Sequence, residues 1–541
     1  MSFVVSHDFI KATTHAELKA YRDKVARDED NSRGYVISTD MEIESSQLSL
    51  DALKDISLVA KAIGDDKSTS AIDAILLARD GQFDALIPNF QAFSAVLESY
   101  LKDNLIDGWI YLKKPDGKFY PALVTYLSYK KGTEHSSESI LLHVCHVSPN
   151  LDRGYYGFEH DYVAFYPGDV SQKRIYEALE LKGVFKETSV LKAQYEASYD
   201  RYCQLIKDQF SEQFVAKGNI YVSKAHSIMN GSLIDTKVIH DMSAQDVKTH
   251  RQFRESFLVD GQEKLLSLPE WSLMRVFNLA THDYVWLHSD FLTSYEYDKS
   301  LKDKLILPQT HRDLLDVLTT NVDAFSGDII EGKTAGNVIL CKGIPGVGKT
   351  LTAEIYSEII ERPLYLLHSG SLGTTAKEIE ENLRVVFSRS ERWNCVLLLD
   401  EADVFIVRRN DNIEQNAIVA EFLRTMEYFN GLLFMTTNRP HDIDEAIISR
   451  CAAIINYEAP TLDNAPKIWQ VLAEQYGYTL PETLLAHLLE TFQGITPRDI
   501  KMLLRLALRV AANKNAEPDI ETFRQCAMFR AIKMAESNDY A

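Results

Sequence analysis

The sequence predicts a parallel α/β domain that is followed by a bundle of helices and preceded by an α+β region. Three observations lead to this fold class. Beyond about residue 300, short apolar runs alternate with helical stretches, which is typical of a parallel sheet covered by helices. Beyond Pro460, only helical patterns remain. In the first half, Pro115-Asp116-Gly117-Lys118 joins two strand-like stretches, which indicates a β-hairpin.

The predicted parallel strands are short apolar runs, as expected of strands that are buried on both faces. They cover residues 337–341, 364–368, 395–399, 432–436 and 453–457. The bundle is predicted to contain helices at residues 462–475, 481–492, 497–512 and 518–532, and three of these open with proline, which suits the first helical position. We therefore expect a large α/β subdomain over residues 301–458 and a helical lid over residues 459–541.

Residues 1–300 form the predicted α+β region. Helices are expected at residues 50–63, with Ser49 as a possible N-cap, and at 72–77, 89–101 and 190–215. Strands are expected at residues 109–113, 120–129, 140–147, 162–166, 219–222, 233–239, 273–279 and 284–288. Together with the hairpin signal, this order favours a mostly antiparallel sheet. No catalytic constellation is recognisable in this region.

The composition is ordinary for a soluble globular protein, with 45% hydrophobic and 25% charged residues. The formal net charge of −20 disfavours whole-surface binding to nucleic acid or anionic lipid, although a local basic groove remains compatible with it. No stretch approaches the roughly 20 apolar residues needed to span a bilayer, and the first residues lack a secretion signal. The six cysteines are scattered, so we expect free thiols and a cytoplasmic protein.

The strongest chemical motif runs from Gly343 to Thr350 and fits the phosphate-binding loop (P-loop) pattern G-x-x-x-x-G-K-[ST]. A predicted strand precedes it and a predicted helix follows, and in that setting glycines turn backbone N–H groups toward phosphates. Lys349 is expected to contact the β- and γ-phosphates of a nucleotide, and Thr350 is expected to ligate Mg²⁺. The predicted nucleotide-binding residues are Gly343, Pro345, Gly346, Val347, Gly348, Lys349, Thr350 and Leu351.

A second motif, Asp400-Glu401, follows the apolar run at residues 395–399. Both carboxylates are expected at the carboxyl edge of the sheet, where ligands bind in folds of this class. Asp400 is the candidate Mg²⁺ ligand, and Glu401 is the candidate general base that orients the attacking water. A solvated acidic turn would have the same sequence, and it is the preceding P-loop that favours catalysis.

Three further polar residues follow in order. Asn438 ends the next strand and is placed to reach the γ-phosphate or the water. Arg450 ends a helix predicted to begin near Asp444, and an arginine there could enter the nucleotide site of a neighbouring subunit. Arg498 opens the third lid helix and could couple the lid to the γ-phosphate. Taken singly, each also fits a structural role, as a loop cap, a helix C-terminal cation or a surface arginine.

The order of these motifs resembles that of the AAA+ ATPases, and more closely the AAA branch. Residues 397–409 (LLLDEADVFIVRR) and 434–450 (FMTTNRPHDIDEAIISR) resemble its Walker B motif and second region of homology. The resemblance covers about residues 300–535 and implies ATP hydrolysis in a ring, usually a hexamer, with ATP and Mg²⁺ bound between subunits. It also implies that Asn438 is sensor 1, Arg450 the arginine finger and Arg498 a sensor-2-like residue.

Two features depart from the AAA pattern. Ser449-Arg450-Cys451 holds one arginine where the branch commonly has two, and this triplet resembles that of clamp loaders. The segment in the place of the central pore loop, residues 369–375, contains no aromatic residue, so Leu372 is the only candidate for gripping a polypeptide. The absence of an aromatic residue weakens the prediction of processive threading, whereas the prediction of ATP hydrolysis does not depend on this segment.

Three functional hypotheses follow. The leading one is a ring-forming, chaperone-like ATPase that remodels a protein target recruited by residues 1–300. The second is a nucleic-acid-linked ATPase, such as a loader or a replication or defence component, although the acidic chain disfavours nucleic acid. The third is a regulatory scaffold that ATP assembles. No membrane partner is expected.

Overall fold

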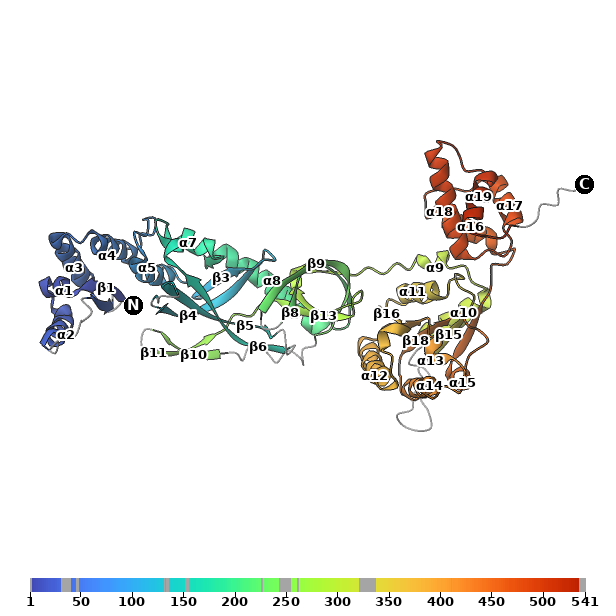
Figure 1. Cartoon of the computed structure of the whole chain (residues 1–541), viewed down its shortest axis with the longest axis horizontal. Helices are drawn as coiled ribbons and strands as arrows, with labels where there is room; N and C mark the ends of the chain where they lie inside the picture. The colour runs from blue at the N-terminus through green and yellow to red at the C-terminus, as the bar shows by residue number, and fades with distance from the viewer. Residues whose placement is uncertain are drawn as a thin grey trace, which may run out of the picture.

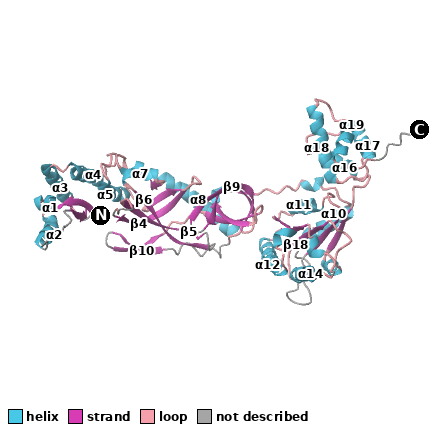
Figure 2. Cartoon of the chain, viewed as in Figure 1, coloured by secondary structure: helices cyan, strands magenta, loops and turns pink. Residues whose placement is uncertain are grey.

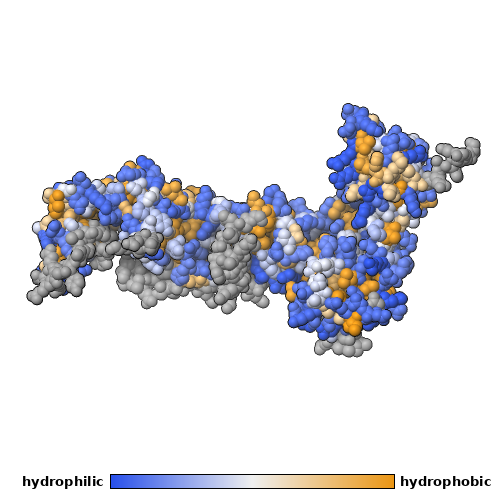
Figure 3. Space-filling view, in the orientation of Figure 1, coloured by the Kyte–Doolittle hydropathy of each residue, from blue (hydrophilic) through white to orange (hydrophobic). Residues whose placement is uncertain are grey.

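The computed structural model describes the chain except for residues 1, 31–39, 45–47, 131, 133–135, 151–154, 225–226, 243–253, 260–261, 321–336, 410 and 535–541. The molecule is elongated, with amino-terminal helices at one end, antiparallel sheets in the middle, and the parallel sheet and carboxyl-terminal helices at the other end (Figure 1). Hydrophilic residues predominate on the face seen in Figure 3, where apolar residues occur in small groups. Within the described residues, no helix is both long and apolar enough to cross a membrane.

The amino-terminal end is a small helical unit with a two-stranded antiparallel sheet. Its elements are β1 (Ser2–Ser6), α1 (His7–Ala12), α2 (Lys19–Asp30), β2 (Asp40–Glu44), α3 (Leu50–Ile63), α4 (Asp66–Arg79) and α5 (Phe90–Lys102). The prediction of a helix over residues 50–63 is confirmed, because the Ser49 side chain accepts a hydrogen bond from the Ala52 N–H at the start of α3. Gly64 ends α3 with a left-handed φ of 79°, a conformation that glycine adopts readily.

Two five-stranded antiparallel sheets follow, rather than the single sheet that we expected (Figure 2). The first has the order β6-β5-β4-β3-β7 and contains β3 (Trp109–Lys113), β4 (Phe119–Lys130), β5 (Ser139–Asn150), β6 (Tyr155–Phe165) and β7 (Val184–Lys186). The second has the order β13-β12-β9-β8-β14 and contains β8 (Gln213–Lys224), β9 (Ser227–His240), β12 (Leu273–Asn278), β13 (Asp283–His288) and β14 (Leu292–Ser294). Its strand β13 also pairs with β8, so the sheet curls back on itself. The strands β10 (Arg254–Val259) and β11 (Gln262–Ser267) pair separately.

Local sequence signals in this region identify the β3–β4 hairpin but not the end of the long helix. The predicted hairpin is confirmed, since β3 and β4 pair antiparallel around Gly117, whose φ is 80°. The long helix predicted over residues 190–215 is α8 (Ser189–Asp208), and it ends before Gln213 begins strand β8. The prediction was wrong at that end because buried apolar residues such as Phe214 and Ala216 occur both in helices and in strands. Pairing with the neighbouring strand β9 makes this segment a strand. Two shorter helices, α6 (Pro167–Val170) and α7 (Ile175–Leu181), precede β7.

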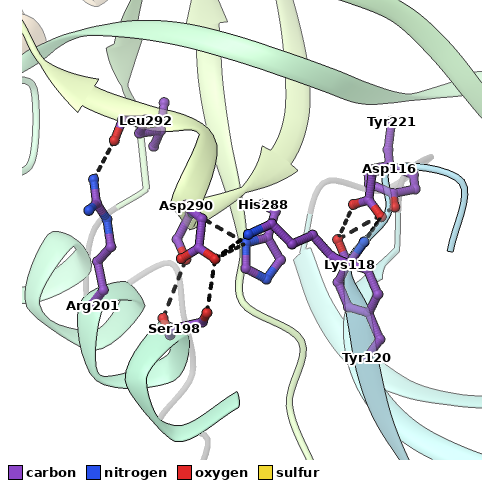
Figure 4. Close-up of polar contacts among 10 residues, drawn as sticks. Asp116, Lys118, Tyr120, Ser198, Arg201, Tyr221, His288, Asp290 and Leu292 are labelled. Carbon is purple, nitrogen blue, oxygen red and sulfur yellow. Dashed lines mark hydrogen bonds and ion pairs between the residues drawn. The ribbon is translucent and has the colours of Figure 1, made fainter. Parts of the chain in front are cut away.

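A half-buried ionic cluster joins the β3–β4 hairpin to the second sheet (Figure 4). Lys118 Nζ lies 2.5 Å from Asp290 Oδ2, and Ser198 Oγ on α8 donates to the same oxygen at 3.0 Å. Burial acts to raise the pKa of Asp290, but the hydrogen bonds from Lys118 and Ser198, together with the charges of Lys118 and His288, outweigh it and the pKa is lowered. Burial lowers the pKa of the adjacent His288 to about 4, so this imidazole is neutral at pH 7.

Two tyrosines extend the same contact between the sheets. Tyr120 on β4 donates from its hydroxyl to Asp116 Oδ2 at 2.6 Å, and Tyr221 on β8 donates to the Tyr120 hydroxyl at 3.4 Å (Figure 4). Both rings are buried, so the polar contacts and the apolar core stabilise the same junction. We interpret the whole cluster as a structural joint between the two sheets.

The carboxyl-terminal half contains the predicted parallel sheet. Its strands are β15 (Asn337–Gly343), β16 (Leu364–His368), β17 (Val396–Asp400), β18 (Leu432–Thr437) and β19 (Ala453–Tyr457), in the order β16-β17-β18-β15-β19. The helices around it are α9 (Leu301–Lys304), α10 (Gln309–Thr320), α11 (Lys349–Ile359), α12 (Ala376–Trp393), α13 (Asp403–Ile406), α14 (Ile413–Met426) and α15 (Glu445–Arg450). All four strand pairings are parallel, which confirms the predicted α/β class.

The last part of the chain is a four-helix unit with its own apolar core (Figure 1). It consists of α16 (Ala465–Glu474), α17 (Glu482–Thr491), α18 (Pro497–Asn513) and α19 (Ile520–Phe529). Only α18 begins at the proline that we expected to open it. Pro481 is the N-cap of α17, and Asp519 rather than Pro518 caps α19 because its side chain accepts from the Thr522 N–H.

The second antiparallel sheet packs directly on the α/β subdomain. Phe277 on β12 is fully buried, with its ring centroid 4.8 Å from that of Trp393 at the end of α12 and 5.4 Å from that of Tyr365. Near the end of α11, Glu358 Oε1 accepts hydrogen bonds from Tyr295 Oη at 2.7 Å and from Lys237 Nζ at 3.2 Å. The antiparallel sheet therefore contacts the carboxyl-terminal ends of two helices that flank the parallel sheet.

Candidate active site

The P-loop connects the end of β15 to the start of α11, as the motif predicts. Two of its glycines are required by geometry. A Cβ on Gly343 would lie 2.2 Å from the Tyr457 carbonyl oxygen of the neighbouring strand, and one on Gly346 would lie 2.8 Å from Arg498 Cβ. Gly346 also has a φ of 85°, which other residues rarely adopt. The loop is thus wedged between β19 and the first turn of α18.

The structure brings the P-loop lysine and the predicted strand-end asparagine together. Lys349 is 6% exposed, and its Nζ donates to the Gly343 and Ile344 carbonyls at 2.9 and 2.8 Å and to Asn438 Oδ1 at 2.9 Å. Burial lowers the pKa of Lys349 from its usual value, while the nearby Asp400 acts in the opposite direction. The ammonium group is therefore held by oxygen acceptors at the mouth of the loop.

Thr350 and Asp400 lie together at the carboxyl edge of the sheet. Thr350 Oγ1 donates to Asp400 Oδ1 at 2.8 Å, although the two residues come from different elements. A hydroxyl beside a carboxylate is a set of hard oxygen donors, which suits Mg²⁺ that keeps several of its waters. The donor chemistry of these two residues therefore fits the ion that the sequence implies.

Glu401 is exposed at the end of β17, next to Asp400. Its φ of 53° is left-handed, an uncommon conformation for a residue with a side chain, and turns the backbone out of the strand direction. Its N–H donates to Thr436 Oγ1 at 3.0 Å. A carboxylate presented in this way is accessible to water at the same edge as Lys349.

Arg498 is placed against the P-loop by the start of α18. Its backbone N–H donates to the Gly346 carbonyl at 3.1 Å, while its side chain is exposed. The carboxyl-terminal helices thus contact the P-loop directly, and the arginine side chain lies free to turn toward a phosphate.

Arg450 lies elsewhere. It precedes β19, whose first residue Ala453 is opposite Ile339 early in β15, so Arg450 is at the amino edge of the sheet and Lys349 is beyond the carboxyl edge. Its guanidinium forms an ion pair with Glu427. The structure does not bring Arg450 to the P-loop of its own chain.

The segment at residues 369–375 corrects one expectation. Leu372, the candidate for gripping a polypeptide, is 1% exposed and packs in the core of the α/β subdomain. Its carbonyl accepts a hydrogen bond from Asn382 Nδ2 at 3.0 Å, which fixes the segment against α12. Leu372 is therefore a core residue in this structure.

A cavity of about 420 Å³ opens beside the P-loop. Helix α11 lines it through Leu351 and Glu354, and the loop lines it through Val347 and Gly348. The remaining walls are mostly apolar and come from the α9 connection (Ile306, Leu307), from the lid (Ile468, Leu472, Pro497) and from Leu279 and Lys237 of the antiparallel sheet. A flat, weakly polar ligand group fits such walls.

Sequence reasoning missed most of these wall residues and missed Thr436. Ile306 and Leu307 carry no signal beyond being apolar. Ile468 and Leu472 are four residues apart on one helix, a spacing that would also describe core residues. The pattern that identified Val347 and Leu351 as binding residues is the P-loop motif itself.

Residues 339–459 match the family model described as AAA, ATPase family associated with various cellular activities. Spastin of Anopheles gambiae is 24% identical over 259 residues, which are 43% of this chain and 29% of that protein. Fidgetin-like protein 1 of Drosophila melanogaster is 26% identical over 193 residues, 34% of this chain and 36% of that protein. A putative 26S proteasome regulatory subunit homolog of Methanothermobacter marburgensis is 27% identical over 220 residues, 38% of this chain and 57% of that protein. Each match spans less than two thirds of the relative's length.

Proposed function

From the premise that this chain belongs to the AAA ATPases, with a single AAA domain, we propose that it binds ATP with Mg²⁺ and hydrolyses it to ADP and phosphate. The observation that carries the proposal is the convergence of Lys349, Thr350, Asp400 and Asn438 within hydrogen-bonding distance at one edge of the sheet. These residues come from three separate parts of the chain, the start of α11, the end of β17 and the residue after β18, and they leave Glu401 exposed beside them. Such a constellation suits phosphoryl transfer, which depends on positioning and charge stabilisation.

The residues act on the phosphates as follows in this proposal. Lys349 exchanges its P-loop carbonyl acceptors for β- and γ-phosphate oxygens, and Asn438, already bonded to Lys349, is positioned at the γ-phosphate. Thr350 and Asp400 hold Mg²⁺, which when bound offsets phosphate charge. Glu401 accepts the proton of the attacking water and Arg498 reaches the γ-phosphate from the lid.

The cavity beside the P-loop is the proposed site of the nucleobase. Val347 and Leu351 flank the expected phosphate-binding residues Lys349 and Thr350, and the lid residues Ile468 and Leu472 line the same cavity. A purine of moderate polarity gains from burial between such walls. Closing the lid on the base is then the step that brings Arg498 to the phosphates.

We also propose that copies of the chain form a ring, usually a hexamer in this family, and that Arg450 completes the site of a neighbouring copy. Its position at the opposite edge of the sheet from Lys349 supports a role in another copy rather than in its own site. Residues 301–458 and 459–541 then act as the large and lid subdomains, and residues 1–300 recruit a target.

We favour a protein as the target, and we propose that the ATP cycle remodels this protein. The net charge of −20 disfavours nucleic acid as the target. Because Leu372 is buried, threading of a polypeptide through a pore is not part of the proposal. A cytoplasmic location belongs to the same proposal, because none of the six cysteines, all within the described residues, forms a disulfide bond.

Two variants test the proposal. Lys349→Ala should lose ATP binding, and Glu401→Gln should bind ATP without turnover and should retain its target longest. The measurement is steady-state ATPase activity, followed by capture of bound protein and nucleic acid on Glu401→Gln in ATP, with Lys349→Ala as the control.

The outcomes separate the hypotheses. Full activity in Glu401→Gln would refute the role of this carboxylate. Captured nucleic acid that survives moderate salt, instead of a protein, would favour a nucleic-acid-linked ATPase. Function retained by Glu401→Gln but lost by Lys349→Ala would favour an ATP-assembled scaffold.

A further inference from the structure

One buried hydroxyl contacts both carboxylate-bearing residues of the Asp400-Glu401 pair. Thr436 on β18 is 2% exposed, and its Oγ1 donates to Asp400 Oδ1 at 2.6 Å while it accepts from the Glu401 N–H at 3.0 Å. The Thr436 carbonyl also accepts from the Ala402 N–H at 2.9 Å. A single residue of the neighbouring strand therefore holds three consecutive residues at the end of β17.

The hydroxyl fixes the orientation of the Asp400 carboxylate. Oδ1 accepts from two hydroxyls, those of Thr350 at 2.8 Å and Thr436 at 2.6 Å. With Oδ1 engaged by both, the rotation of the carboxylate is restricted and the direction of Oδ2 is set. A carboxylate that approaches Mg²⁺ directly or through its waters depends on that orientation, because the ion demands nearly ideal octahedral geometry.

The same hydroxyl supports the backbone of Glu401. The φ of 53° at this residue is disfavoured for a side chain, and such conformations persist where the surroundings hold them. The Thr436 hydroxyl is the acceptor of the Glu401 N–H, so it stabilises the turn that presents the Glu401 carboxylate.

We propose that Thr436 is a positioning residue for ATP hydrolysis, and that its hydroxyl orients Asp400 toward Mg²⁺ and Glu401 toward the attacking water. The inference rests on the proposed ATPase activity. Thr436 is buried and its hydroxyl contacts Asp400 and Glu401, so it acts through these two residues. Loss of such an outer partner typically costs about 10–100-fold in metal affinity or activity.

Thr436→Val tests the hydroxyl, because valine keeps the branched shape and removes both hydrogen bonds. We expect kcat to fall by about 10–100-fold and the Mg²⁺ concentration for half-maximal activity to rise. Binding of a fluorescent ATP analogue without Mg²⁺ should stay near the wild-type value, because the Lys349 contacts are untouched. Thr436→Ser, which restores a hydroxyl, should recover most of the loss.

The neighbouring residue provides a matched control. Thr437 is 1% exposed on the same strand, and its hydroxyl donates to Asp403 and accepts from the Arg439 N–H at 2.9 Å. Thr437→Val makes the same chemical change at the same burial without contacting Asp400 or Glu401. It is expected to lower the unfolding temperature in a similar way and to leave the Mg²⁺ requirement unchanged.

The outcomes are distinguishable. If the wild-type chain hydrolyses no ATP, the proposed function fails. If the wild type is active and Thr436→Val shows the wild-type kcat and Mg²⁺ dependence, or Thr436→Ser is as impaired as Thr436→Val, the assignment of Thr436 is overturned. If Thr436→Val does not fold, Thr436→Cys replaces it, because a thiol keeps the size and donates only weakly, and the same two comparisons decide.

Discussion

The contact between the P-loop and the first turn of α18 leads to a specific prediction for Gly346→Ala. The new Cβ would lie 2.8 Å from Arg498 Cβ, whereas carbon atoms in contact prefer about 3.5–4.0 Å, so the start of α18 has to move by roughly 0.7 Å or more. The φ of 85° adds a conformational cost of about 1–2 kcal/mol for an L-residue. Relief of the overlap with Arg498 requires the loop and the helix to separate.

The amide of Arg498 reports that separation. It lies in the first turn of α18, where N–H groups lack partners within the helix, and its acceptor is the Gly346 carbonyl at 3.1 Å. Overpacking of a close contact costs about 1–3 kcal/mol, and a cost of about 1–2 kcal/mol corresponds to roughly a 5–30-fold change in the opening equilibrium. Hydrogen exchange at the Arg498 amide of the nucleotide-free protein should therefore accelerate by about that factor.

Gly348→Ala is the matched control for this experiment. Gly348 has a φ of 101°, so alanine imposes comparable backbone strain, but no described heavy atom lies within 4 Å of the added Cβ. Exchange at Arg498 should change little in this variant. Equal acceleration in the two variants, or none in Gly346→Ala, would show that the P-loop does not position α18 through this contact.

Three other predictions concern stability and the ring. Phe277→Ala removes a fully buried ring from the junction with α12 and should lower the free energy of unfolding by about 3–5 kcal/mol in chemical denaturation; an unchanged midpoint would contradict the packing described. Lys118→Met should destabilise the protein by about 1–3 kcal/mol at pH 7. Because the folded-state pKa of Asp290 is lowered, this loss should shrink as pH falls below about 4, and a pH-independent loss would exclude the ion pair as its source. Arg450→Ala should abolish turnover with little change in ATP affinity, and mixing it with Glu401→Gln should restore some activity; a mixture with no activity would argue against a role in trans.

The elements that the sequence predicted correctly carry local signals. Ser49 caps α3 and Gly117 turns the hairpin, and each acts through atoms a few residues away. The parallel strands were recognisable because they are buried on both faces and therefore continuously apolar. The number of antiparallel sheets was not predictable in this way, because it depends on pairings such as Trp286 with Tyr221 that join distant parts of the chain.

The site residues also differ in whether a local motif or the tertiary structure identifies them. The P-loop motif specifies Lys349 and Thr350 by spacing alone, but the meeting of Lys349 with Asn438 depends on the order of the strands. Thr436 was invisible as a site residue, since a threonine in a buried strand is ordinary for its β-propensity. Leu372 was the only candidate for gripping a polypeptide in the segment that takes the place of the pore loop, and only the packing against α12 shows that it belongs to the core.

Helix α11 has a thermodynamic consequence that extends beyond the nucleotide. It begins at Lys349 in the P-loop. Near its other end, Glu358 accepts hydrogen bonds from Lys237 on β9 and from Tyr295 just after β14, so one rigid element of roughly 16 Å connects the P-loop to the antiparallel sheet. Any molecule whose binding to that sheet shifts α11 through Glu358 also shifts Lys349 at the other end of the helix, and so changes the affinity for ATP. Linkage then requires ATP to change the affinity for that molecule by the same factor and in the same direction. The strength of this coupling is measurable from either end, with nucleotide titrated against the bound molecule or the reverse.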